Sequence, residues 1–353
     1  MAQTLLKGGR IFDGERFLDG NVLIENGKIL AIGKTEAERA TIYDVSGCIV
    51  TAGLIDIHTH FSEMGNMQFG YPADMASIPF GVVYAVDCGA LYSNPAVLDS
   101  LSVETKVFIP IYITNGDINY NAMEEIIKSY GDRLVGIKIY FDKTLNNQID
   151  IELVKKACEY ARQKNLKVMV HCSNSPTPML DIINTLEKGD ILTHAYHGDC
   201  STIEEDNYIA YKTAKEKGVI IDAGMAGGVH TNFKIFKRAI EKGIIPDTIS
   251  SDITKFSAYM RGGVYGLPMC MSIARLLGME EEGVFKAVTS NAKKAVNANG
   301  WANMEVNAPA TISVLKWDNT NIDITDRDGN NVTSSQGYVC KMTMKNGQIL
   351  YRN

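Results

Sequence analysis

The sequence lacks the features that mark several large classes of protein. It has no apolar run of about 18 residues, and its start lacks a basic segment followed by an apolar core, which argues against a membrane span and a secretory signal. It has no run of lysine or arginine, and its formal charge is −6, so we expect neither nucleic acid nor a membrane as partner. These absences predict a cytoplasmic protein that acts on a small molecule, and they leave open whether it forms a homo-oligomer.

Disulfide and common cofactor motifs are absent as well. The seven cysteines are odd in number, widely spread and without CxxC spacing, which argues against a disulfide framework and a zinc ribbon. We find no support for a Ser-His-Asp arrangement, a phosphate-binding glycine loop or a dinucleotide fingerprint. The 353 residues, 45% hydrophobic and 22% charged, have an ordinary globular composition with room for one large domain and a small one.

Short β-rich apolar runs recur through the middle of the chain. Eight of them begin 24 to 32 residues apart, near positions 54, 82, 106, 134, 166, 190, 218 and 247. Helical spacing lies between most of them, most clearly over residues 151–163, 203–215 and 232–241. Eight strand-then-helix units predict an α/β protein with a (β/α)8 TIM barrel over residues 51–300, although a doubly wound open sheet would give similar runs.

Both ends of the chain show a different, β-rich pattern. Residues 1–50 and 301–353 hold short alternating segments, and the pairs Asn26-Gly27 and Asn346-Gly347 are typical of hairpin turns. Strands need partners, and chain ends often lie close together. We therefore expect the two ends to build one small β-sandwich domain beside the barrel.

Four of the six histidines stand at the ends of predicted barrel strands. His58 and His60 end the first strand in the run GLIDIHTH, His171 ends the fifth strand and His194 the sixth. The C-terminal ends of barrel strands form the face where active sites lie, so these imidazoles should converge there. A lone HxH pair is more often just two polar residues at a strand end, but four converging histidines predict a metal site.

Lys138 and Asp252 are charged residues in two other predicted strands. Lys138 lies between Ile137 and Ile139, where an unpaired ammonium is costly or loses its proton. It could snorkel or pair with an acid, or it could be a neutral amine that has captured carbon dioxide as a carbamate. Asp252 ends the eighth strand, where it could bind metal and accept a proton from water, or simply cap a turn.

The order of these residues is similar to that of a known family. GLIDIHTH, the strand-four lysine, the two strand-end histidines and the strand-eight aspartate together resemble the amidohydrolase superfamily. The segments VHCSNSP, LTHAYHG and PDTISSD resemble its deacetylase-like branch, whose members often carry the names dihydroorotase or adenine deaminase. The resemblance implies two divalent metal ions, zinc above manganese, iron or nickel, bound by His58, His60, carboxylated Lys138, His171, His194 and Asp252.

The resemblance also implies a reaction. A hydroxide that bridges the two metals would attack an amide or ester carbonyl, and Asp252 would carry the proton as the catalytic residue. The implied enzyme is a hydrolase of carbon–nitrogen bonds other than peptide bonds, acting as a deacetylase on a small N-acyl or O-acyl compound. Alternatives are cyclic-amide opening as in dihydroorotase, aminopurine deamination, and a catalytically inactive barrel used as a binding module.

Further residues near the predicted mouth are candidates for substrate contact: His197, His230, Tyr140, Arg261 and Cys88. His197 stands where relatives often carry asparagine, and His230 follows strand seven. Arg261 could bind a substrate carboxylate as a planar fork or remain a solvated loop charge. Cys88 ends strand two, and the related D-aminoacylases use a cysteine near this position as a metal ligand, which is its alternative role.

Overall fold

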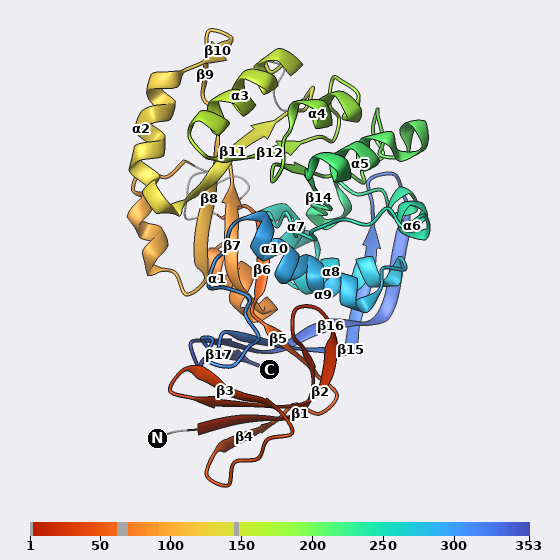
Figure 1. The fold of residues 1–353 in the computed structure, drawn as a ribbon. Coiled ribbons are helices and arrows are strands. Elements are labelled where there is room, and N and C mark those ends of the chain that lie inside the picture. Colours follow the sequence, from red (N-terminus) through yellow and green to blue (C-terminus); the bar gives the residue numbers. More distant parts are fainter. Residues whose placement is uncertain (1–2, 62–69, 90, 145–147) are drawn as a thin grey trace.

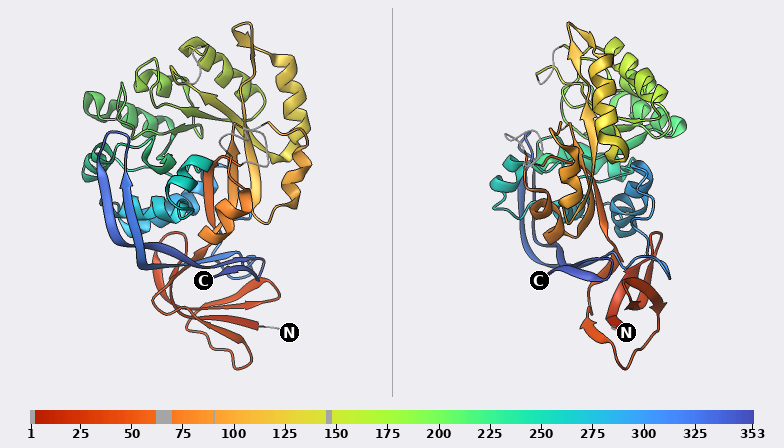
Figure 2. Two further views of the ribbon diagram at one scale, coloured as in Figure 1. Left: turned by 180° about the vertical axis from the view of Figure 1, so that it is seen from behind. Right: turned by 90° about the vertical axis from the view of Figure 1, so that its left-hand side faces the viewer.

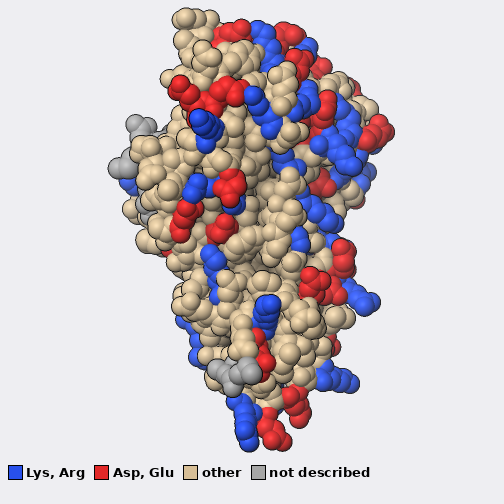
Figure 3. All heavy atoms as spheres, turned by 60° about the vertical axis from the view of Figure 1, so that its left-hand side comes forward, with Lys and Arg blue, Asp and Glu red and all other residues tan. Residues whose placement is uncertain are grey.

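A computed structural model describes residues 3–61, 70–89, 91–144 and 148–353 of the chain. It contains a barrel of parallel strands and, at one end of it, a sheet built from both termini (Figure 1). Acidic and basic side chains are interspersed over the face drawn in Figure 3. Every helix in the described part of the chain is too short or too polar to span a membrane. All seven cysteines are free, and six of them are buried.

Seven parallel strands form the wall of the barrel, in the spatial order β14-β13-β12-β11-β8-β7-β6. Each begins within two residues of its predicted start, and their side chains are largely buried because helices cover the sheet from outside. Their bounds are β6 (Leu54–Thr59), β7 (Val82–Cys88), β8 (Glu104–Pro110), β11 (Leu134–Tyr140), β12 (Lys167–His171), β13 (Ile191–Thr193) and β14 (Ile220–Asp222).

The eighth predicted strand closes the barrel without forming a regular ladder. Thr248 makes an isolated parallel bridge with Asp222 of β14, and Ile253 makes one with Thr59 of β6. Residues 247–253 therefore pair with β14 at their start and with β6 at their end. They fill the gap between the two edge strands, and the predicted (β/α)8 barrel is confirmed in this form.

Helices follow most of the strands and lie on the outside of the barrel (Figure 2). The helix α3 (Ile151–Gln163) has the predicted bounds. Its start is fixed by Asp150, whose side chain accepts a hydrogen bond from the N–H of Leu153. The remaining helices are α1 (Ala73–Ser77), α2 (Tyr120–Tyr130), α4 (Met179–Thr185), α5 (Glu205–Lys217), α6 (Phe233–Glu241), α7 (Lys255–Met260), α8 (Leu267–Leu276), α9 (Glu281–Val288) and α10 (Ser290–Ala295), with short 3₁₀ turns η1 (Ile78–Phe80), η2 (Pro95–Ser100), η3 (Gly131–Arg133) and η4 (Ala226–Gly228).

Strands from both ends of the chain join in one sheet, in the order β17-β16-β15-β5-β1-β2-β3, with β4 paired to β1. The ends meet where β5 pairs antiparallel with β15, Ala52 opposite Ile312, which confirms the expected terminal β domain. The predicted Asn-Gly turns connect β2 to β3 and β16 to β17. The strands are β1 (Gln3–Phe12), β2 (Phe17–Glu25), β3 (Lys28–Gly33), β4 (Thr41–Asp44), β5 (Ile49–Ala52), β15 (Ile312–Thr325), β16 (Asn331–Lys345) and β17 (Gln348–Arg352), and a separate small hairpin consists of β9 (Ile113–Thr114) and β10 (Asp117–Ile118).

The hairpin of β15 and β16 leaves the terminal sheet and runs along the barrel toward its mouth (Figures 1 and 2). Ile322 and Tyr338 of this hairpin belong to the hydrophobic core of the barrel. In its turn, Asp326 accepts a hydrogen bond of 2.8 Å from the N–H of Phe233 at the start of α6. The hairpin thus brings a segment of the C-terminal region to the mouth of the barrel, which the sequence did not predict.

A buried carboxylate joins the closing segment to the barrel wall. Asp222, at the end of β14, accepts hydrogen bonds from the hydroxyl groups of Thr193 at 2.7 Å, Thr248 at 2.8 Å and Ser250 at 2.7 Å. Burial raises the pKa of Asp222 to about 6, because the charged form loses its hydration. Three hydroxyl groups from β13 and the closing segment therefore depend on one carboxyl group.

We expect Asp222→Ala to lower the free energy of unfolding by about 3 kcal/mol, because three buried hydroxyl groups lose their shared acceptor. Urea denaturation followed by circular dichroism measures the change. The exposed Asp132 in η3 offers a matched control, and Asp132→Ala should change the unfolding free energy by less than about 0.5 kcal/mol. Equal stability of the two variants would contradict the role assigned to Asp222.

Candidate metal centre

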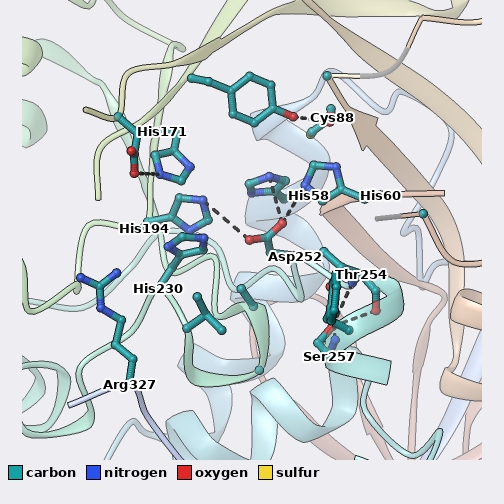
Figure 4. Close-up of a pocket in the computed structure, with 18 of the residues that line it drawn as sticks. His58, His60, Cys88, His171, His194, His230, Asp252, Thr254, Ser257 and Arg327 are labelled. Carbon is teal, nitrogen blue, oxygen red and sulfur yellow. Dashed lines mark hydrogen bonds and ion pairs between the residues drawn. The ribbon is translucent and has the colours of Figure 1, made fainter. Parts of the chain in front are cut away.

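The mouth of the barrel contains a cavity of about 710 Å³, a size suited to a small molecule. Its wall combines strand ends, the η4 loop, α7 and the turn of the long hairpin. The polar side chains gather at its base (Figure 4). The residues among them that could ligate a metal ion include His58, His60, His171, His194, His230 and Asp252.

The two histidines of β6 meet Asp252 at the centre of the cluster. Oδ1 of Asp252 lies 2.9 Å from Nε2 of His60 and 3.4 Å from Nε2 of His58. Within the described part of the chain, neither contact is aligned as a hydrogen bond, and this buried oxygen has no hydrogen-bond partner. Buried carboxylate oxygens are normally satisfied, so a cation bound between these three groups fits the arrangement.

Lys138 reaches the same cluster from β11. It is fully buried, and its Nζ lies 2.9 Å from Nε2 of His58 and 3.4 Å from Sδ of Met169. Burial lowers the pKa of Lys138, and burial together with the nearby Lys138 lowers the pKa of His58 well below its usual value. Among the described residues no carboxylate lies within ion-pair distance of Lys138, so the alternative of a simple salt bridge is not what the structure shows.

Three further imidazoles stand together on the other side of Asp252. One nitrogen atom from each of His171, His194 and His230 lies within 4.8 Å of the others. Nδ1 of His194 donates a hydrogen bond of 2.7 Å to the carbonyl oxygen of Gly224, which leaves its Nε2 as an acceptor. The structure therefore brings all four predicted strand-end histidines to one site, and it adds His230, which the sequence had suggested only as a substrate contact.

Polar neighbours orient the other imidazoles from behind. Nδ1 of His58 lies 3.1 Å from the hydroxyl of Thr193, and Nε2 of His171 lies 3.6 Å from Oδ2 of Asp142. One ring nitrogen of each histidine thus has a polar protein neighbour, and in His58 the opposite nitrogen faces Lys138 and Asp252. This arrangement is typical of histidines that bind metal.

Tyr140 and Cys88 both line the cavity but contact each other. The Tyr140 hydroxyl donates a hydrogen bond of 3.0 Å to the backbone oxygen of Cys88. Sγ of Cys88 lies 3.7 Å from Sδ of Met169, and burial raises the pKa of this thiol well above its usual value. Cys88 joins neither group of candidate ligands, so its alternative role as a metal ligand finds no geometric support.

His197 is not among the residues that line the cavity, whereas Arg261 is. His197 is buried behind the cavity wall, where its Nδ1 accepts a hydrogen bond of 3.1 Å from the N–H of Asp199. Arg261 does line the cavity, but it donates hydrogen bonds to the backbone oxygens of Asp323 at 3.1 Å and Gly227 at 3.3 Å. Its guanidinium therefore connects the long hairpin to the η4 loop, and its contact with a substrate stays a prediction.

Three charged residues that line the cavity were not predicted from the sequence, namely Asp87, Asp142 and Arg327. Asp87 is the penultimate residue of β7, accepts a hydrogen bond from the Tyr92 hydroxyl, and has its pKa raised to about 7 by burial. Asp87 and Asp142 stand at or just after strand ends, so the rule that identified the histidines could have found them. Arg327 pairs with Asp199 from the turn of the long hairpin, and no local pattern marks that position.

Comparison with known proteins gives a consistent picture. No protein-family model matches the chain. A deacetylase from Enterococcus faecalis is 26% identical over 353 residues, covering 92% of each protein, and one from Brucella anthropi is 24% identical, covering 86% of this chain and 81% of the relative. Crystal structures of a dihydroorotase and an adenine deaminase superpose with a TM-score of 0.84 each, at 21% and 22% identity; the first match covers 100% of this chain and 98% of the neighbour, the second 100% of both.

The fold and the convergent imidazole and carboxylate groups define the class of barrel hydrolases that depend on metal ions. Within that class, the chain is similar to the amidohydrolase superfamily, the family that its sequence motifs resemble. The deacetylase-named relatives, which cover most of the chain, support the deacetylase-like branch.

The position of Arg261 predicts that it fastens the hairpin to the mouth. In Arg261→Ala, we expect amide hydrogen exchange in residues 226–232 and 322–330 to accelerate about tenfold, because two hydrogen bonds from a charged donor are lost. Exchange measured by mass spectrometry checks this, with the exposed Arg39→Ala as control. Unchanged exchange in both segments would show that Arg261 does not hold them together.

Proposed function

We propose that this protein is a binuclear metal-dependent amidohydrolase that removes an acyl group from a small N-acyl or O-acyl compound. The observation that carries this proposal is Oδ1 of Asp252, a buried oxygen without a hydrogen-bond partner in the described structure, held between Nε2 of His58 and His60. The curated relatives named deacetylase, which match along most of the chain, support the choice of reaction.

The ligand types suit zinc, and manganese, iron or nickel can use the same groups. His58, His60 and Asp252 would hold the more buried ion, His171 and His194 the more exposed one, and carboxylated Lys138 would lie between them. When bound, such ions lower the pKa of water toward neutrality and polarise a carbonyl oxygen.

In this proposal, Asp252 moves the proton of the reaction. Its buried carboxylate stands between the β6 histidines and His194, whose Nε2 is 3.8 Å from Oδ2. It would accept a proton from the attacking water and return it to the leaving nitrogen or oxygen. Arg261, whose hydrogen bonds go to backbone oxygens, adds positive charge to the cavity wall, which favours a substrate with a carboxylate group.

Carboxylation of Lys138 completes the proposal. A neutral amine can add to the carbon of carbon dioxide, form a C–N bond and release one proton, which leaves a carbamate anion with two ligand oxygens. The full burial of Lys138, its lowered pKa and its position 2.9 Å from Nε2 of His58 support this modification.

The reaction is tested by incubating the metal-loaded protein with N-acetyl amino acids, an O-acetyl ester, dihydroorotate and adenine. We expect acetate from the acetyl compounds, whereas ammonium would favour the deaminase alternative and a ring-opened acid the cyclic-amide alternative. Asp252→Asn should lower kcat by about 10²–10⁴-fold, because the proton carrier is lost. A near-wild-type rate in this variant would refute the role of Asp252, and no turnover of any compound would favour the binding-module alternative.

Lys138→Ala tests the carbamate. We expect this variant to bind fewer than two metal ions and to lose most activity, and we expect added propionate to restore part of both by supplying a bridging carboxylate. Elemental analysis and the acetate assay measure the two effects. If the variant keeps two metal ions and full activity without propionate, the carbamate does not bridge the ions.

A further inference from the structure

The proposed function uses two imidazoles for the more exposed metal ion, but the structure places a third beside them. The ring centroids of His194 and His230 are 4.3 Å apart, and those of His171 and His230 are 4.9 Å apart. His230 comes from the loop that follows η4, and in Figure 4 its ring lies next to that of His194. His230 therefore belongs to the same cluster of candidate ligands as His171 and His194.

A single hydroxyl group orients two of the three rings. Oγ of the fully buried Ser173 lies 2.7 Å from Nε2 of His171 and 2.9 Å from Nδ1 of His230. A serine hydroxyl has two acceptor lone pairs, so it can accept an N–H from each ring. The lone pairs of His171 and His230 then reside on Nδ1 and Nε2 respectively, the nitrogens that Ser173 does not contact.

His194 follows the same rule with a backbone partner. Its Nδ1 donates to the carbonyl oxygen of Gly224, so its free lone pair is on Nε2. Each of the three imidazoles therefore has one nitrogen engaged by a fixed polar partner and one available for a ligand bond, the pattern of metal-binding histidines.

The loop that carries His230 is held on both sides. The N–H of Asn232 donates a hydrogen bond of 2.9 Å to the carbonyl oxygen of Tyr196, and the next N–H, of Phe233, binds Asp326 of the long hairpin. His230 is thus presented by backbone that the barrel and the hairpin fix together.

The three rings lie close to the spacing that one metal ion requires. Two nitrogens bound at about 2.1 Å to a tetrahedral zinc ion are about 3.4 Å apart. One nitrogen from each ring lies within 4.8 Å of the others, so the pairs must close by up to about 1.4 Å for one ion to bind all three. Three protein ligands and one open position are the usual coordination of a catalytic zinc ion.

We propose that His230 is a third imidazole ligand of the more exposed metal ion. Together with His171 and His194 it forms a three-histidine site that holds this ion without the carbamate of Lys138. This inference rests on the proposed function, since it assigns a further ligand to one of its two metal ions.

Metal binding tests the proposal without any activity assay. Protein stripped by a chelator is titrated with Co²⁺ in the presence of bicarbonate, and the bound equivalents and their dissociation constants are measured by visible absorption and elemental analysis. We expect two equivalents in the wild type, and in His230→Ala a second equivalent that binds at least about tenfold more weakly. His197→Ala removes a nearby buried histidine outside the cluster and should bind Co²⁺ as the wild type does.

The outcomes separate this inference from the proposed function. Two unchanged equivalents in His230→Ala would overturn the inference and leave the binuclear hydrolase intact. If the wild type binds no Co²⁺, both fail together. If it binds only one equivalent, the binuclear proposal fails, and loss or retention of that equivalent in His230→Ala supports or overturns the ligand assignment.

A spectroscopic signal distinguishes the loss of a metal ligand from the loss of folding. In His230→Cys, a thiolate at this position should produce a sulfur-to-cobalt charge-transfer band that the wild type lacks, and its absence in folded, Co²⁺-loaded protein would overturn the proposal. Lys138→Ala should keep the ion bound by the three histidines, and combining it with His230→Ala should weaken the binding of that ion further. Equal retention in the single and double variants would also contradict a three-histidine site.

Discussion

Closure of the barrel by residues 247–253 is the constraint on which the rest of the site depends. This segment bonds to β14 at its start and to β6 at its end. The N–H of Asp252 donates a hydrogen bond of 2.8 Å to the backbone oxygen of His58, so the carboxylate and the HxH pair share one register. Because this hydrogen bond fixes which residue lies beside His58, a shift of one residue would move the Asp252 carboxylate away from the imidazoles. The contacts that close the barrel therefore also bring Asp252 to the histidines of β6.

The long hairpin extends this coupling to the terminal sheet. β15 pairs with β5 in that sheet, yet the turn of the same hairpin contacts α6 through Asp326 and the cavity through Arg327. Arg261 joins the hairpin to η4 from the opposite side. The terminal domain therefore does more than cover the hydrophobic base of the barrel, since it supplies part of the wall that a substrate would contact.

The strand positions and the strand-end ligands could be predicted because both follow from local pattern. Parallel strands are apolar runs that end in polar residues, so His171 and His194 were visible at the ends of theirs. Asp87 and Asp142 obey the same rule and were overlooked. Arg327 and the ligand-like position of His230 could not be predicted, because they depend on how a hairpin and a loop pack across the mouth, and no periodicity records such contacts.

Two of the candidate ligands, His194 and Asp252, have an unusual backbone conformation. His194 and Asp252 both have positive φ, 67° and 47°, a conformation that costs a residue with a side chain about 1 kcal/mol or more. Glycine would adopt it freely, so backbone geometry alone does not explain a histidine and an aspartate. The turn at each strand end redirects the side chain toward the cluster, where Nε2 of His194 and Oδ2 of Asp252 lie 3.8 Å apart. Fixed contacts compensate this cost, since the Asp252 N–H bonds to the His58 carbonyl oxygen and Nδ1 of His194 to that of Gly224, and the side-chain atoms are left facing the candidate metal site.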